Sequence, residues 1–260
     1  MTDRAHYTRN PAPWIAGTSD IGLKHQTNQD ALWMATREDP RSAVVAVADG
    51  VSSSMGSERA SLAAVETLVD QVLALLKDGL SIREAFNAAF HGAHEAVLSA
   101  KSGDEPAACT LIGAHIGCDR IFVANVGDSR AYWLGDDEAA ELLSTDDSMA
   151  QARILLGMPR EEAEQSPQAH AITKWLGRDA SDVSPTMTEF VPPTTGWLLL
   201  CSDGLWNYAS SADAMNSLVQ RTLGEHPVPK DATEALVAWA IDQGGRDNIT
   251  VTLARVEPPR

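Results

Sequence analysis

The sequence lacks most features of secreted and membrane proteins. It has three cysteines among 260 residues and no CxxC spacing, which argues against a disulfide framework and favours a reducing cytoplasm. The longest apolar runs, at 43–48 and 197–201, are far shorter than the roughly 20 residues that span a bilayer. The first residues contain no apolar stretch of the kind that a signal peptide needs.

Positive charge is also scarce. The chain has 20 Lys and Arg residues against 36 Asp and Glu residues, which gives a formal net charge of −16. Such a surface repels phosphate backbones and anionic lipids, so neither nucleic acid nor a membrane is an expected partner. The same charge is compatible with a local carboxylate cluster that captures a divalent cation.

No repeat, low-complexity tract or linker divides the chain, so we expect a polar tail at 1–10 and one domain at 11–260. Apolar runs predict the strands, and several are apolar at every position, which is typical of strands covered on both faces. The predicted strands are residues 14–19, 31–36, 43–48, 110–116, 121–126, 130–134, 187–190, 197–202 and 248–256.

Two long helices are predicted between the third and fourth strands. Ser57–Lys77 has apolar residues at spacings of three and four, and residues 81–84 (SIRE) fit a capping box that starts the second helix. Two more helices are predicted over 212–223 and 232–243. Because these helix pairs break a simple strand–helix alternation, we expect an α+β fold of mainly antiparallel sheets with helical layers.

Aspartates occur at the ends of the predicted buried strands. These residues are Asp30, Asp49, Asp128, Asp203 and Asp247. Carboxylates gathered at sheet ends repel one another unless a cation lies among them, and oxygen ligands without clustered His or Cys suit Mg²⁺ or Mn²⁺. Two such ions would activate a water molecule and hold a phosphoryl group. A divalent-metal hydrolase is therefore one hypothesis, while an Asp-Gly after a strand is also typical of a plain turn.

At these same residues the sequence resembles the PPM family, the metal-dependent type 2C Ser/Thr protein phosphatases. The similar blocks occur in order across nearly the whole chain. They are residues 19–22 (SDIG) with 28–30 (NQD), 47–50 (VADG), 124–132 (ANVGDSRAY), 200–206 (LCSDGLW) and 245–250 (GRDNIT). The stretch at 48–54 (ADGVSSS) is similar to a bacterial branch of that family.

The resemblance implies a four-layer αββα sandwich with a binuclear Mg²⁺ or Mn²⁺ centre in a cleft between the sheets. By position, Asp49 would bridge both metals and Gly50 would offer its carbonyl to one of them. Asp203 and Asp247 would hold the other metal. Asp128 would contribute to a third, weaker metal site.

The implied reaction is hydrolysis of phosphoserine or phosphothreonine by direct attack of metal-activated water, without a phosphoenzyme. Asp30 would orient that water, and residues 145–172 correspond to a flap that shapes substrate access. The implied partners are a phosphorylated protein substrate and an opposing Ser/Thr kinase, acting in signal transduction in the bacterial cytoplasm.

Two positions depart from the family pattern. His25, beside Lys24, stands where the family commonly has a phosphate-binding Arg, and Gln29 replaces an acid. We expect Lys24 and His25 to contact the substrate phosphate, although an imidazole is a weaker clamp than a guanidinium. A rival interpretation is a metal-binding, weakly catalytic regulatory module that recognises a protein partner.

Other kinds of site fit the sequence less well. Ser129 within Gly-Asp-Ser resembles an esterase nucleophile, but no histidine follows His226 to serve as its base. Asp49-Gly-Val lacks the second acid of an aspartyl-phosphate phosphatase. The spacing of His91 and His94 fits no zinc-protease motif, so structural histidines are expected there.

Three further residues are predicted to be structural. Arg130 lies within a strand and is expected to pair with a structural acid. Cys109 and Cys201 lie in apolar strands and are expected to pack as small hydrophobic residues.

Overall fold

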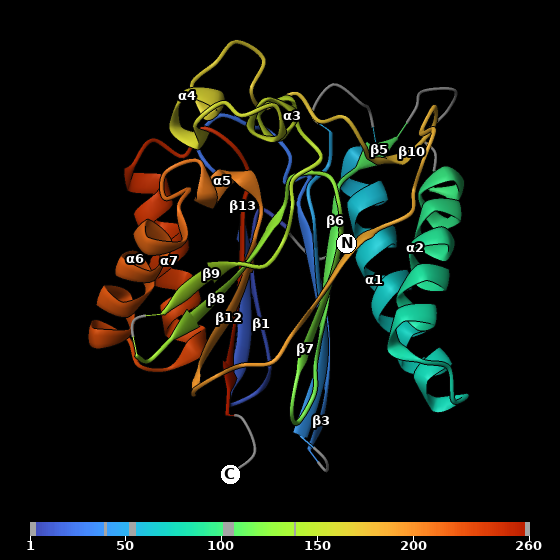
Figure 1. The fold of residues 1–260 in the computed structure, drawn as a ribbon, viewed down its shortest axis with the longest axis horizontal. Helices are drawn as coiled ribbons and strands as arrows, with labels where there is room; N and C mark the ends of the chain where they lie inside the picture. Colours follow the sequence, from blue (N-terminus) through green and yellow to red (C-terminus); the bar gives the residue numbers. More distant parts are fainter. Residues whose placement is uncertain (1–3, 39–40, 52–55, 101–106, 138, 258–260) are drawn as a thin grey trace.

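The computed structural model describes residues 4–38, 41–51, 56–100, 107–137 and 139–257. Two antiparallel sheets pack face to face, and a pair of helices covers the outer face of each, so the molecule has four layers (Figure 1). The predicted α+β fold with an αββα arrangement is confirmed. Residues 1–3, residues 52–54 of the 48–54 stretch and residues 258–260 lie outside the described part.

The first sheet joins the two ends of the chain. Its six strands lie in the order β1-β2-β13-β12-β8-β9, and every neighbouring pair is antiparallel. The strands are β1 (His6–Ala12), β2 (Ile15–Asp20), β13 (Ile249–Val256), β12 (Gly196–Cys201), β8 (Arg130–Gly135) and β9 (Ala140–Leu142).

The second sheet has five strands in the order β11-β7-β6-β4-β3, again antiparallel throughout. They are β11 (Thr186–Phe190), β7 (Ile121–Val126), β6 (Leu111–Ile116), β4 (Arg41–Ala48) and β3 (Ala31–Glu38). A separate short ladder pairs β5 (Ala108–Cys109) with β10 (Leu176–Gly177).

Helices α1 (Ser57–Lys77) and α2 (Ile82–Ser99) cover the second sheet, and α6 (Ala212–Glu225) and α7 (Pro229–Asp242) cover the first (Figure 1). The predicted capping box is present, because the Ser81 side chain accepts from the backbone of Glu84 and the Glu84 carboxylate accepts from the backbone of Ser81. Three short helices lie at one end of the sandwich (Figure 1). They are α3 (Met149–Leu155), α4 (Arg160–Glu164) and α5 (Asp203–Trp206).

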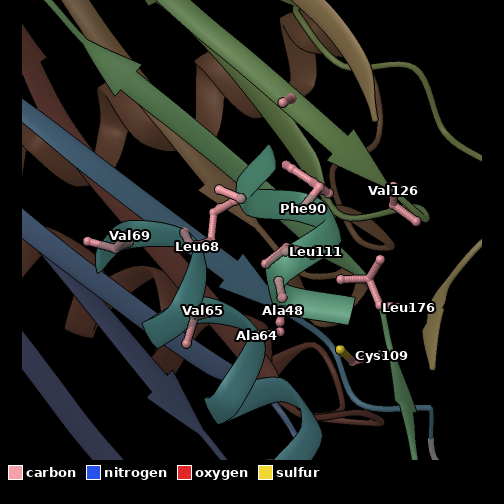
Figure 2. Packing of buried hydrophobic residues seen from close by; sticks show 14 of the residues in the cluster. Ala48, Ala64, Val65, Leu68, Val69, Phe90, Cys109, Leu111, Val126 and Leu176 are labelled. Atoms are coloured by element: carbon pink, nitrogen blue, oxygen red, sulfur yellow. The ribbon is translucent and has the colours of Figure 1, made fainter. Parts of the chain in front are cut away.

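The central strands are apolar at every position because they separate two cores. In β4, Val44 belongs to the cluster beneath α1 and α2, whereas Val45 belongs to the cluster between the two sheets. Figure 2 shows the first of these clusters, in which Leu68 of α1 and Phe90 of α2 lie over Leu111 of β6. Alternate residues of one strand thus stabilise different layers, which holds the sheet ends rigidly.

Residues 6–10 do not form the polar tail that was expected. They belong to β1, which pairs with β2 at the sheet edge. Their polar composition misled the prediction, because an edge strand can keep polar side chains in solvent and can carry Pro11 at an irregularity in the register. Tyr7 alone of these residues packs against the core between the sheets.

The burial of α1 predicts a large difference between two leucines of this helix. Leu68 is fully buried (Figure 2), whereas Leu73 is 37% exposed. Leu68→Ala should lower the free energy of unfolding by about 3 kcal/mol because it leaves a cavity beneath α1, and Leu73→Ala should lower it by less than about 1 kcal/mol. Urea unfolding measures both values, and equal losses would contradict the assignment of the core.

Candidate metal centre

The register of the sheets brings the five predicted aspartates to the same end of the sandwich. Ala48 pairs with Ala31, so Asp49 and Asp30 lie side by side at the ends of two neighbouring strands of the second sheet. In the first sheet, Cys201 pairs with both Arg130 and Val251. The residues just outside these pairs include Asp128, Asp203 and Asp247, which are therefore close in space although they are far apart in the sequence.

These carboxylates act on one another electrostatically. Burial and then repulsion from four neighbours, Asp30, Asp203, Asp128 and Asp247, raise the pKa of Asp49 well above its usual value. Burial, followed by repulsion from Asp128, Asp247 and Asp30, raises the pKa of Asp203 in the same way. The pKa values of Asp30 and Asp128 are each raised to about 7, mainly by burial. The cluster is therefore costly to ionise in the absence of a cation.

Two fully buried carboxylate oxygens of the cluster lack a hydrogen-bond donor within the described part of the chain. They are Oδ1 of Asp30 and Oδ1 of Asp203, and both are buried. The second oxygens are satisfied, because Ser202 Oγ donates to Asp30 Oδ2 at 2.7 Å and Asn207 Nδ2 donates to Asp203 Oδ2 at 3.1 Å. A buried carboxylate oxygen without a donor is a group that a hard cation would satisfy.

Gly50 occupies a position where only glycine fits. A Cβ atom there would lie 2.7 Å from the Gln29 carbonyl oxygen and 2.7 Å from Cβ of Ser57. The two backbone bonds on either side run from Thr110 N to Asp49 O at 2.8 Å and from Val51 N to Ala108 O at 3.0 Å. The Gly50 carbonyl takes part in neither bond.

The cluster is loose rather than closed. Across the described residues, no three Asp, Glu, His or Cys side chains are already placed to hold one ion. One oxygen of Asp247 is occupied, since Oδ1 accepts from the Asn248 backbone at 2.8 Å and lies 3.1 Å from His25 Nε2. The donor set still fits Mg²⁺ or Mn²⁺, because these ions commonly combine one or two carboxylates with water molecules.

His25 and Lys24 lie at the rim of the cluster, in a loop that packs against residues 245–247. Leu23 N donates to Gly245 O at 2.8 Å. Gly22 has φ +69°, and a Cβ there would lie 2.2 Å from the Asp247 carbonyl oxygen. The His25 imidazole faces the Asp247 carboxylate, while Lys24 is exposed.

Arg130 connects the carboxylate cluster to the segment predicted as a flap. Its Nη2 lies 2.7 Å from Asp146 Oδ2 and 2.9 Å from Glu164 Oε1 of α4. The guanidinium lies 3.7 Å from the ring centroid of Trp206, whose Nε1 donates to the Asp128 carbonyl at 2.9 Å. The expectation that Arg130 pairs with a structural acid is confirmed.

The sequence did not predict the roles of Trp206 and Glu164. Trp206 lies three residues after Asp203 in the block at 200–206, and Glu164 belongs to a short polar helix without a periodic pattern. Cys109 and Cys201 are fully buried, as predicted. No helix in the described ranges is both long and apolar enough to cross a bilayer.

A family model and several known proteins match most of this chain. The family model for protein phosphatase 2C covers residues 16–239, which include four of the five aspartates. The Ser/Thr phosphatase stp of Listeria innocua is 31% identical over 90% of this chain and 92% of its own length. PstP of Mycobacterium tuberculosis is 29% identical over 93% of this chain, but the chain spans only 44% of the length of PstP.

Solved structures share the fold. The Ser/Thr phosphatase of S. agalactiae superposes with a TM-score of 0.77 and 26% identity, covering 96% of this chain and all of the other. MsPP of Mycobacterium smegmatis is a PPM Ser-Thr phosphatase solved with cacodylate. It superposes with a TM-score of 0.75 and 29% identity, covering 93% of this chain and 97% of the other. The catalytic domain of PstP, solved with two manganese ions, superposes with a TM-score of 0.68 and 23% identity, covering 96% of this chain and 99% of the other.

The repulsion within the cluster predicts that one amide substitution stabilises the metal-free protein. Asp203→Asn removes a negative charge and should raise the free energy of unfolding in EDTA by on the order of 1 kcal/mol. The same variant should gain less thermal stability than the parent when Mn²⁺ is added. Asp70, an exposed residue of α1, provides the matched control. Asp70→Asn should change neither the free energy of unfolding in EDTA nor the gain in thermal stability with Mn²⁺. A less stable Asp203→Asn protein in EDTA would count against the mutual repulsion.

The raised pKa values also predict a pH dependence. Asp30 and Asp128 bind protons up to about pH 7 when folded, whereas an unfolded Asp releases its proton near pH 3.9. Their contribution to stability is therefore largest below about pH 4 and is lost as pH rises through 7, with a slope of at most roughly 1.4 kcal/mol per pH unit for each proton. Denaturant unfolding in EDTA at pH 5 and pH 8 tests this, because a metal-free protein that is more stable at pH 8 would refute it.

Proposed function

Because the chain belongs to the protein phosphatase 2C family, we propose that it is a Mn²⁺- or Mg²⁺-dependent phosphatase that hydrolyses phosphoserine and phosphothreonine in proteins. The observation that carries this proposal is the convergence of five strand-end aspartates in one region, with two buried oxygens that lack donors. The relatives reported above are named Ser/Thr phosphatases, so the alternative of a weakly catalytic regulatory module is not favoured.

We assign the ion-binding roles as follows. Asp49 would help to hold two ions, and the Gly50 carbonyl would be a ligand of one of them. Asp203, which has an unpartnered Oδ1, and Asp247 would hold the other ion. Asp128 would contribute to a third, weaker site. The bound ions would supply Lewis acidity, which lowers the pKa of a water molecule and offsets the charge of the phosphoryl group. The manganese ions in the PstP domain support trying Mn²⁺ first.

Asp30 is suited to orient the attacking water. Ser202 holds its Oδ2, which fixes the carboxylate and leaves Oδ1 free to accept a hydrogen bond from water. Since Asp30 is fully buried beside Asp49, a water held by Oδ1 would lie within the cluster. This is a positioning role, which acts through the water rather than on the substrate.

His25 and Lys24 are proposed to contact the substrate phosphate. The His25 imidazole is held at the rim, because its Nε2 lies 3.1 Å from Asp247 Oδ1, and a ring N–H there can donate to a phosphate oxygen. Lys24 is exposed next to it and can swing toward an anion. Both residues lie on the loop that packs against residues 245–247, which keeps them near the carboxylates.

The biological setting is part of the same proposal. A phosphoprotein substrate requires an enzyme that phosphorylates it, so an opposing Ser/Thr kinase is the expected partner. The cysteines carry no disulfide within the described part of the chain, and two of them are buried, which supports action in the reducing cytoplasm.

The assignment predicts the loss of activity on substitution of the ligands. With Mn²⁺ and a phosphothreonine peptide, Asp49→Ala and Asp203→Asn should each lower kcat by at least about 100-fold, because the ions lose an anionic ligand. Asp70→Asn should retain the parental rate. Phosphate release measured by a colorimetric assay gives the rates, and full activity of either ligand variant would refute the assignment.

A further inference from the structure

A cavity of about 420 Å³ opens beside the carboxylate cluster. Gly204 and Asp247 line its inner end, and Glu161 and Glu164 of α4 line the side formed by the flap. Arg246 also lines it. The cavity thus connects the proposed reaction centre with the segment that covers it, where the part of a substrate next to the phosphorylated residue would lie.

The backbone of Arg246 is held in place while its side chain is exposed. Gly244 and Gly245 before it have φ values of 137° and 50°, which form a tight turn between α7 and β13. The Arg246 N–H donates to the Tyr208 hydroxyl at 3.3 Å, and Gly245 O accepts from Leu23 N. The guanidinium is therefore presented from a fixed loop.

The charged side chains that line the cavity differ in their ion pairs, and among the described residues neither Glu161 nor Arg246 has one. Glu164 is engaged by Arg130 at 2.9 Å and by Arg160 at 3.0 Å, and Asp247 is engaged by His25. Within the described ranges, no carboxylate lies within 4.0 Å of the Arg246 guanidinium. In a protein of net charge −16, an arginine without an acidic partner at this position is a group that an anionic ligand would complete.

We propose that Arg246 is a substrate-binding residue that pairs with an oxyanion of the phosphoprotein. This inference depends on the proposed phosphatase function. Two sources offer the same chemistry: the phosphoryl group that is hydrolysed, and an acidic side chain next to it in the substrate. A guanidinium recognises both through paired N–H donors, which a lysine ammonium does not reproduce.

The test compares Arg246→Gln and Arg246→Lys with Arg221→Gln, an exposed arginine on α6 outside this cavity. The substrates are p-nitrophenyl phosphate and two phosphothreonine peptides that differ only in Glu or Gln beside the phosphothreonine. Inorganic phosphate is measured as a competitive inhibitor. Arg246→Gln should raise KM for the acidic peptide about fivefold and keep kcat within about twofold of the parental value. The KM of Arg246→Lys should lie between those of the parent and Arg246→Gln, and the KM of Arg221→Gln should equal that of the parent.

The pattern across substrates identifies the oxyanion. If Arg246 binds the scissile phosphate, KM for p-nitrophenyl phosphate and the inhibition constant of phosphate rise with the peptide KM. If it binds a neighbouring acid, only the Glu peptide is affected. Unchanged KM for every substrate together with an unchanged phosphate inhibition constant would overturn the proposal.

A binding measurement separates this proposal from the proposed function. Fluorescence anisotropy reports the affinity of each protein for a labelled peptide that carries a non-hydrolysable phosphonate. A parent protein that turns over no phosphopeptide would refute the phosphatase function. The proposal for Arg246 would still be supported if the Arg246→Gln protein bound the peptide about fivefold more weakly than the parent. It would be overturned if the Arg246→Gln protein bound the peptide as tightly as the parent.

Discussion

Mutual repulsion among buried carboxylates is the constraint on which this end of the molecule depends. Asp49 is repelled by four other aspartates, and the surrounding protein removes the water that would screen them. Such a cluster persists only where the rest of the fold holds it in place. Here the two apolar cores on either side of β4 provide that support, because each strand end is fixed from both faces.

Features encoded by local pattern were predictable, and features that depend on distant contacts were not. The α1 bounds, the capping box at Ser81 and the limits of β7 were found from periodicity and spacing. The aspartates were found because strand ends can be located in the sequence and because their motifs resemble a known family. β1 was missed because an edge strand needs no apolar run, and its pairing with β2 only becomes visible in three dimensions.

The contacts of Arg130 show the same limit within the site. Its identity as a buried ion-pair residue follows from a charge inside an apolar strand, but the sequence does not name its partners. Asp146 and Glu164 lie 16 and 34 residues away along the chain, and the Trp206 ring closes the other side. A buried guanidinium shared between a sheet strand, a short helix and an indole ties the position of the flap to that of Asp128.

The order of strands in the first sheet has a consequence for how the protein is made. β13 lies between β2 and β12, so the sheet has no continuous centre until residues 249–256 have been synthesised. A nascent chain that ends before residue 247 would hold β2 and β12 without the strand that joins them, and Asp247 would be missing from the other carboxylates. The topology thus delays assembly of the carboxylate cluster until translation has passed this strand.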